Sequence, residues 1–152
     1  MLGLETKNKV TRGGFTILEI LLSIAVIGIL SGILIPVSRS FQLINDLDVA
    51  ANTTVQTLRR AQLLSQAMDG DTSWGVRVQS GNITLFKGAS YASRDPAFDE
   101  TFSSPSVTVS GLQEVVFSKF LGTPQTTGTL VLTSANNEVR EIVINGKGRI
   151  DY

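Results

Sequence analysis

The chain lacks both cysteine and histidine over its 152 residues. Without cysteine, no disulfide can cross-link the fold. Without histidine, the commonest general base and the commonest transition-metal ligand are both missing. The sequence also contains no nucleophile elbow, no phosphate-binding loop and no metal-spaced cluster of side chains. These absences predict a protein that is not an enzyme and that uses no cofactor and no metal.

Charge is balanced over the whole chain, with 13 basic and 13 acidic residues. A balanced chain has no bulk attraction for nucleic acid. Locally the charges are unevenly spread, because residues 15–37 contain a single charged side chain, that of Glu19. A lone carboxylate near the start of a long apolar stretch is costly, so its presence requires a reason.

The apolar stretch from Phe15 to Val37 predicts a long helix. Such a helix would rise by about 34 Å, enough to cross the hydrocarbon core of a bilayer. Because basic residues outnumber acids before it, the positive-inside rule predicts that the N-terminus stays in the cytoplasm. A secretory signal peptide has a shorter apolar core with its cleavage site after it, whereas Gly13 and Gly14 precede this stretch. A plain signal anchor fits the length but gives no role to the glycine pair or to Glu19.

The residues at 13–19, Gly-Gly-Phe-Thr-Ile-Leu-Glu, followed by the apolar stretch, resemble the N-terminus of type IV pilin-like precursors. This family includes type IV pilins and the pseudopilins of type II secretion. The resemblance implies that a prepilin peptidase cleaves after Gly14, the second residue of the pair Gly13-Gly14, and so removes residues 1–14 as a leader. It also implies that the new N-terminal Phe15 is methylated and that residues 15–37 form a transmembrane and filament-core helix.

Glu19 would be the fifth residue of the processed chain. In the family, a glutamate at this place pairs with the N-terminal amine of a neighbouring subunit. Such a pair is physically reasonable, because opposite charges attract strongly in a low-dielectric filament core and each is expensive to leave alone. The alternative is an interfacial charge that reaches the lipid headgroups.

Three further residues of the apolar stretch are expected to act in assembly. Gly28 and Gly32 form a Gly-x-x-x-Gly pattern, and small residues allow helices to approach closely in lipid. Pro36 lies at the end of the stretch, where a proline removes a backbone hydrogen bond and kinks or loosens the helix. The alternative at Pro36 is a helix that only bends at the membrane surface.

Residues 38–70 are expected to continue the helix as an amphipathic segment. Apolar and small residues recur there at three- and four-residue steps, which predicts one buried stripe. The stripe comprises Leu47, Ala51, Val55 (or Thr54), Leu58, Ala61 and Ser65 to Met68. The sequence Asp69-Gly70-Asp71 predicts the stop, since glycine suits a C-terminal cap.

Residues 71–152 are expected to form an antiparallel β domain, because short alternating runs replace the helical pattern. The expected strands are 74–78, 83–86, 107–109, 114–117, 129–133, 139–145 and 149–152, and residues 88–106 are expected to be a loop. Trp74 and Phe86 are expected in the core under the helix. The predicted fold is therefore α+β: a long N-terminal helix, membrane-spanning in its first half, packed on a C-terminal antiparallel β domain.

The order of a long helix followed by an all-β domain makes the resemblance to one group within the family more specific. The sequence Leu-Arg-Arg-Ala-Gln at 58–62, the all-β tail and the Gly-Lys-Gly-Arg sequence at 146–149 are similar to the minor pseudopilin H and to related minor type IV pilins. The resemblance implies a structural subunit of a type II secretion pseudopilus or a type IV pilus. Its implied partners are other pilin or pseudopilin subunits, prepilin peptidase, the inner-membrane assembly platform, and membrane lipid before assembly. Its implied location is the bacterial inner membrane, single-pass, with the β domain periplasmic or extracellular.

Two smaller signals leave alternatives open. Lys147 and Arg149 lie in a glycine-rich tail, and some relatives of this group bind DNA through such a tail during DNA uptake. An ordinary turn before an edge strand is the simpler interpretation. Asp95, Asp99 and Glu100 could supply oxygen ligands to calcium, but their spacing matches no calcium loop, and solvated loop acids are far commoner.

Overall fold

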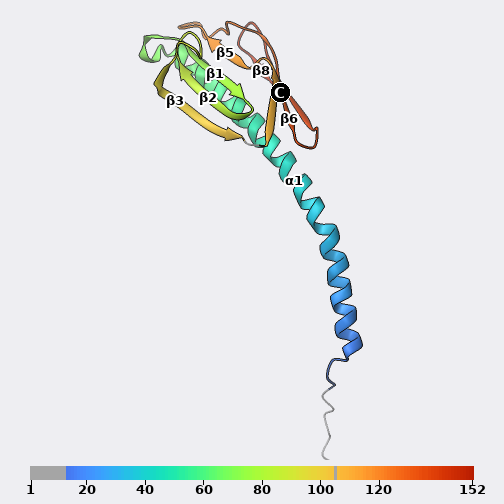
Figure 1. Cartoon of the computed structure of the whole chain (residues 1–152). Helices are drawn as coiled ribbons and strands as arrows, with labels where there is room; N and C mark the ends of the chain where they lie inside the picture. The colour runs from blue at the N-terminus through green and yellow to red at the C-terminus, as the bar shows by residue number, and fades with distance from the viewer. Residues whose placement is uncertain (1–12, 105) are drawn as a thin grey trace, which may run out of the picture. The chain divides into compact units, whose positions relative to one another are not determined.

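The computed structural model describes residues 13–104 and 106–152, with the side chains of 33–38 and 40 left out. The chain divides into two compact units, Met1–Ser38 and Arg39–Tyr152. The second unit holds all the strands, and Figure 1 shows them gathered around the last part of helix α1.

Helix α1 is assigned from Ile17 to Gln66, and its described side chains fall into two stretches, 17–32 and 41–66. The boundary between the two units also falls within this helix. The predicted combination of helix and antiparallel sheet agrees with the structure, but the predicted long apolar helix does not. The first described stretch, 17–32, is shorter than the predicted apolar helix, and the second, 41–66, buries one stripe in the core of its unit and is not apolar all round.

The predicted membrane-spanning helix is contradicted. Within 13–104 and 106–152, no helix is both long and apolar enough to cross a membrane. The first described stretch, 17–32, would rise by about 24 Å, which is less than a hydrocarbon core of about 30 Å. The inner-membrane, single-pass localisation depended on that helix and is contradicted with it.

The strands of the second unit form two four-stranded antiparallel sheets. The first sheet has the order β3-β2-β1-β5, from β3 (Asp95–Ser104), β2 (Gly81–Lys87), β1 (Trp74–Gln79) and β5 (Glu114–Phe117). The second has the order β4-β6-β7-β8, from β4 (Val107–Gly111), β6 (Gly128–Ser134), β7 (Val139–Ile144) and β8 (Ile150–Asp151). The predicted hairpins β1–β2 and β6–β7 are confirmed. A short 3-10 helix, Asp69–Asp71, follows α1 at the predicted stop.

The expected loop over 88–106 is wrong in its second half, because β3 pairs there with β2. Two acids of this polar segment are paired with cations: Arg94 Nε lies 2.7 Å from an Asp99 oxygen, and Arg60 makes two hydrogen bonds to Glu100 at 2.6 and 2.7 Å. Pairing of charges allows a polar sequence to serve as an exposed edge strand.

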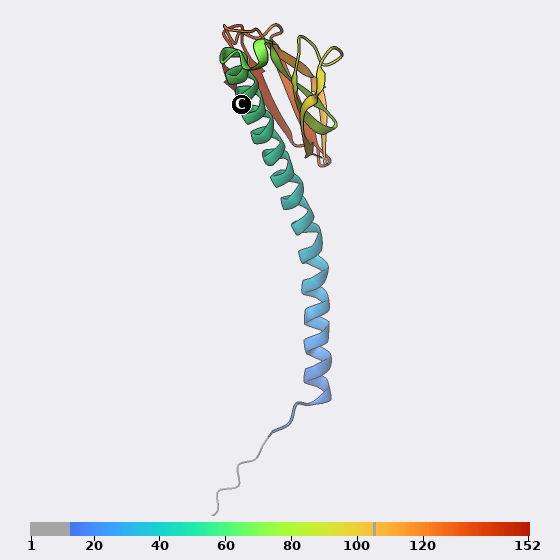
Figure 2. The same ribbon diagram turned by 90° about the vertical axis from the view of Figure 1, so that its left-hand side faces the viewer.

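The core lies between the second stretch of α1 and the two sheets. Figure 2 shows the helix running beside the strands. The predicted helical stripe is confirmed from 47 to 65, since its members are buried there, whereas Met68 is exposed. Trp74 joins this core, but Phe86 does not. Alternation along β2 places Phe86 on the opposite face from Leu85, where its ring meets that of Tyr91 at 5.5 Å.

Polar contacts fasten the helix to both sheets. Ser65 Oγ accepts a hydrogen bond from the backbone N–H of Trp74 at 2.9 Å and donates one to the carbonyl oxygen of Phe117 at 3.2 Å. Arg140 Nε on β7 lies 2.9 Å from an Asp48 oxygen on α1. These contacts, with the Arg60–Glu100 pair on β3, give the second stretch of α1 a defined place in its unit.

Candidate assembly surface

The first turn of α1 is capped by Thr16. The backbone N–H of Glu19 lies 3.3 Å from Thr16 Oγ1 and 3.1 Å from the Thr16 carbonyl oxygen. Thr16 is therefore the N-cap, and Glu19 lies in the first turn, where a carboxylate is favoured by the helix macrodipole. This cap was not predicted from the sequence, although Thr16 and Glu19 have the Thr-x-x-Glu spacing of a capping box.

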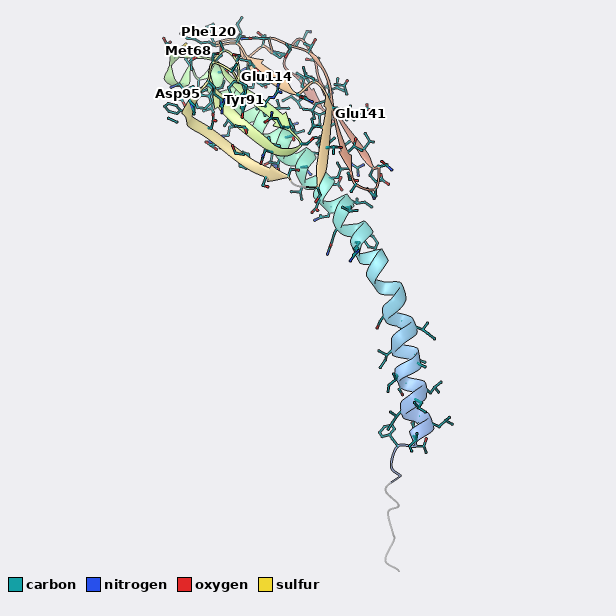
Figure 3. The ribbon with its side chains drawn as sticks, in the orientation of Figure 1. Met68, Tyr91, Asp95, Glu114, Phe120 and Glu141 are labelled. Atoms are coloured by element: carbon teal, nitrogen blue, oxygen red, sulfur yellow. The ribbon has the colours of Figure 1, made fainter. Side chains whose placement is uncertain are left out.

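The stretch that follows exposes apolar side chains on every side. Figure 3 shows side chains projecting all around this part of the helix. The exposed large apolar residues are Phe15, Ile17, Leu18, Ile20, Leu21, Leu22, Ile24, Val26, Ile27, Ile29 and Leu30. Soluble monomers rarely expose apolar patches of this extent, and a helix that is apolar all round is normally buried against something. We call residues 15–32 the apolar helix surface.

The polar groups on this surface are almost all satisfied within the chain. Ser23 Oγ donates to the Glu19 carbonyl oxygen at 2.7 Å, and Ser31 Oγ donates to the Ile27 carbonyl oxygen at 2.8 Å. Within the part of the chain that the structure describes, the Glu19 carboxylate makes no ion pair. Whatever covers this surface must therefore provide for one negative charge.

The two glycines of the Gly-x-x-x-Gly pattern are not required by the packing of their own chain. A Cβ built on Gly28 or Gly32 would meet no atom within 4 Å. Their four-residue spacing puts them on one face of the helix. The side chain of Pro36 lies outside the described residues, so its role stays a prediction.

The proposed processing site lies before the helix. Gly13 and Gly14 are exposed and adopt no helical structure, and Phe15 is 80% exposed. No atom lies within 4 Å of a Cβ built on either glycine. Within the described residues, the backbone at this point is exposed and belongs to no helix or strand, which is typical of sites that a peptidase can reach.

The glycine-rich tail does not present a free basic patch. Arg149 Nε lies 2.7 Å from an Asp151 oxygen, and the backbone N–H groups of Lys147 and Arg149 both donate to Asn145 Oδ1 at 3.0 Å. This is a turn stabilised by an asparagine side chain, with one of its two cations paired. The geometry therefore does not favour the DNA-binding alternative.

The acids considered for calcium are separated by their partners. Asp99 pairs with Arg94 and Glu100 with Arg60, while Asp95 Oδ1 accepts the Ala97 N–H at 3.1 Å. Among the residues whose placement is described, no group of three acids is arranged to hold a metal ion.

Comparison with known proteins adds no relative: no protein-family model, no curated protein and no solved structure matches this chain. The resemblance to type IV pilin-like precursors thus depends on residues 13–37 and on the order of helix and strands. The apolar helix surface, with its cap, its glycine pair and its single carboxylate, is the feature of the molecule that most needs a partner.

Proposed function

We propose that this chain is a structural subunit, not an enzyme, of a type II secretion pseudopilus or a type IV pilus. A prepilin peptidase cleaves after Gly14, Phe15 is methylated on its new amine, and the apolar helix surface packs against the same surface of neighbouring subunits. One observation carries the proposal: an exposed Gly-Gly pair directly precedes a capped helix that is apolar all round and has no packing partner among the described residues of its own chain.

Burial of the apolar helix surface supplies the driving force for assembly. Each large apolar side chain contributes about 1.5–3 kcal/mol when it is fully buried. Part of this gain is offset by the loss of translational and rotational freedom and by the ordering of side chains. The many exposed members of the surface leave a favourable balance.

The charge pairing of Glu19 follows from what the surface contains. Residues 15–32 carry no basic side chain. In an interface built only from copies of this surface, the counter-charge for Glu19 must be the N-terminal amine that cleavage creates at Phe15. A carboxylate and an amine that lose their water together are stabilised only when they are paired. Cleavage and assembly are thereby linked, since the uncleaved chain has no amine at this place.

Intact-mass and N-terminal analysis of the processed protein tests the first step. We expect a chain that begins at N-methyl-Phe15. A chain that keeps Met1, or one cut after residue 37, would contradict the proposal.

A pair of variants tests the second step. Glu19→Ala should leave cleavage intact but prevent most incorporation into filaments. Thr16→Ala is the matched control: it should cost about 1 kcal/mol at the helix start and should leave incorporation largely unchanged. Normal incorporation of Glu19→Ala would rule out the charge pairing, and equal losses in the two variants would assign Glu19 to capping alone.

A further inference from the structure

A turn at one end of the second unit presents two apolar side chains to solvent. Phe120 and Leu121 are 69% and 65% exposed. Phe120 has φ 73°, and the Leu121 N–H donates to the Lys119 carbonyl oxygen at 2.9 Å. These features define a γ-turn with left-handed φ, which is rare and strained for an aromatic residue. We call residues 118–123 the Phe120 loop.

The Phe120 loop is fastened to the end of α1. The Phe120 N–H donates to the Ser65 carbonyl oxygen at 3.0 Å, and Gln62 Nε2 donates to the Gly122 carbonyl oxygen at 3.0 Å. Lys119 pairs with Asp71 just beyond the helix. Strained backbone persists only where its surroundings hold it, and such sites concentrate at functional positions. The backbone that carries Phe120 and Leu121 is thus already held in place. A contact made by these two side chains would therefore cost less conformational entropy.

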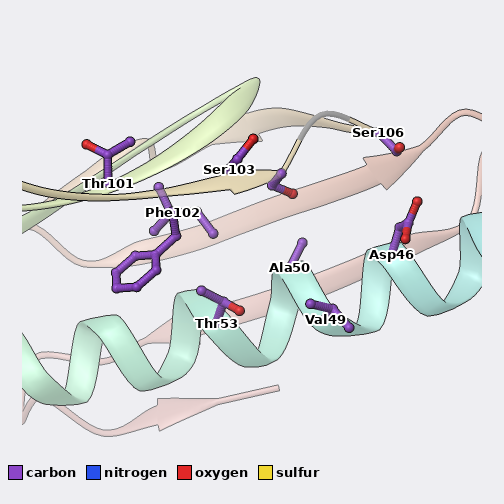
Figure 4. Close-up of a pocket in the computed structure, with 10 residues that line it drawn as sticks. Asp46, Val49, Ala50, Thr53, Thr101, Phe102, Ser103 and Ser106 are labelled. Carbon is purple, nitrogen blue, oxygen red and sulfur yellow. The ribbon is translucent and has the colours of Figure 1, made fainter.

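A groove lies between α1 and the edge strand β3, in the same unit (Figure 4). Val49, Ala50 and Phe102 give it apolar walls, Thr53 adds a hydroxyl group, and the Ser103 side chain points to the other face of β3. Its volume is about 440 Å³, within the range of protein binding pockets. Val49 is 56% exposed. We call this the α1–β3 groove.

The loop and the groove lie at separate places along one packed helix. The groove contacts α1 around Val49, whereas the loop is bonded to Ser65, about 24 Å further along the helix axis. Ser65 lies in the last turn of α1, which ends at Gln66. A single copy cannot join the two features, because the packed sheets hold both in place. Two copies can join them head to tail.

We propose that the Phe120 loop of one copy inserts into the α1–β3 groove of a second copy. Charges agree with this contact: Lys119 is the only charged residue of the loop, and Asp46 is the only charged residue among the described ones that line the groove. The Lys119 ammonium has three donors, so it can hold Asp71 and reach Asp46 together. A head-to-tail contact of this kind repeats without closing. It deepens the proposed filament role, on which it rests, by adding a second interface that is separate from the apolar helix surface.

Cross-linking tests this contact directly, because the chain has no cysteine of its own. In the full-length chain, Leu121→Cys is combined with Val49→Cys, at an exposed residue that lines the groove. A short bismaleimide is added in a nonionic detergent that covers the apolar helix surface. We expect a ladder of dimers, trimers and larger species. The matched control combines Leu121→Cys with Glu141→Cys, which is exposed on β7 (Figure 3), and should give no ladder. Equal products from the two pairs would overturn the proposal.

A loop variant separates docking from folding. Phe120→Gly removes the ring and relieves the left-handed φ, so it should not lower the thermal stability of the chain. It should reduce cross-linking between Leu121→Cys and Val49→Cys by about tenfold or more, since the contact loses the aromatic side chain that it would bury. Unchanged cross-linking would overturn the proposal. Sedimentation of filaments measures assembly through the apolar helix surface, whereas cross-linking measures the contact between the Phe120 loop and the α1–β3 groove. Failure of one interface can therefore be told apart from failure of the other.

Discussion

The two described stretches of α1 differ in where they find partners. Residues 41–66 expose one side and bury a stripe against two sheets, whereas residues 17–32 expose apolar side chains on every side. The first arrangement stabilises the chain that contains it. The second would gain stability only if a partner covered it. Under the proposed function, α1 serves folding in its second stretch and assembly in its first, and burial in the single chain differs between the two accordingly.

The largest effect should come from the buried stripe. Leu58 is fully buried in the core, so Leu58→Ala should lower the free energy of unfolding by about 2–5 kcal/mol. The same substitution at exposed Leu22 should change it by less than about 0.5 kcal/mol. Denaturant unfolding followed at Trp74 measures both. Equal losses in the free energy of unfolding would mean that residues 17–32 pack within the chain, and would contradict the difference between the two stretches of α1.

A glycine substitution should affect assembly and folding in opposite directions. Gly32→Ala meets no neighbouring atom and should stabilise the helix by up to about 1 kcal/mol. If neighbouring helices approach closely at Gly32, the added methyl group should still reduce filament yield. Ser31→Ala, which removes a hydroxyl already bonded along the helix, is the control. Helicity measured by circular dichroism and pelleted filament measured beside it give the two readouts, and a normal yield from Gly32→Ala would exclude close approach.

The smallest effect concerns the ion pair between Lys119 and Asp71, which holds the Phe120 loop near the end of α1. Lys119 lowers the pKa of Asp71 by a hydrogen bond and by its charge. Because the pKa of Asp71 is lower in the folded chain, this pair contributes to the stability of the folded chain above the ordinary pKa of 3.8. That contribution is lost as the pH falls through the lower pKa of the folded chain. The amide signal of Phe120 should therefore shift in acid in the wild type and not in Asp71→Asn. Identical titrations would show that the pair does not hold the loop.

The sequence predicted those parts of the fold that depend on local periodicity. The positions of Leu47, Ala51 and Leu58 follow the helical repeat, and β1, β2, β6 and β7 follow two-residue alternation. Strand β3 was missed because a polar segment that is rich in small residues and contains Pro96 is typical of a loop. Its order depends on distant partners, such as Arg60 for Glu100 and Trp74, whose ring meets that of Phe98 edge-on at 6.3 Å.

The division into two sheets was not predictable for a related reason. Strand β5 pairs with β1 and β4 pairs with β6 across long intervals of sequence, and no local pattern specifies such pairing. On the candidate surface, the Gly-Gly pair, Glu19 and the small-residue pattern could be found by reading residues in order. The Phe120 loop could not, because its exposure and its backbone conformation are set by contacts with the end of α1.

Cysteine labelling of assembled filaments tests the contrast between the two stretches most directly. Ile24 and Gln56 are both exposed in the single chain, so Ile24→Cys and Gln56→Cys would react with a maleimide at similar rates if no other chain covered them. In filaments, we expect Ile24→Cys to react with the maleimide far more slowly than Gln56→Cys, when each rate is normalised to the rate in the denatured protein. Equal rates at the two positions would contradict the claim that neighbouring subunits bury the apolar helix surface.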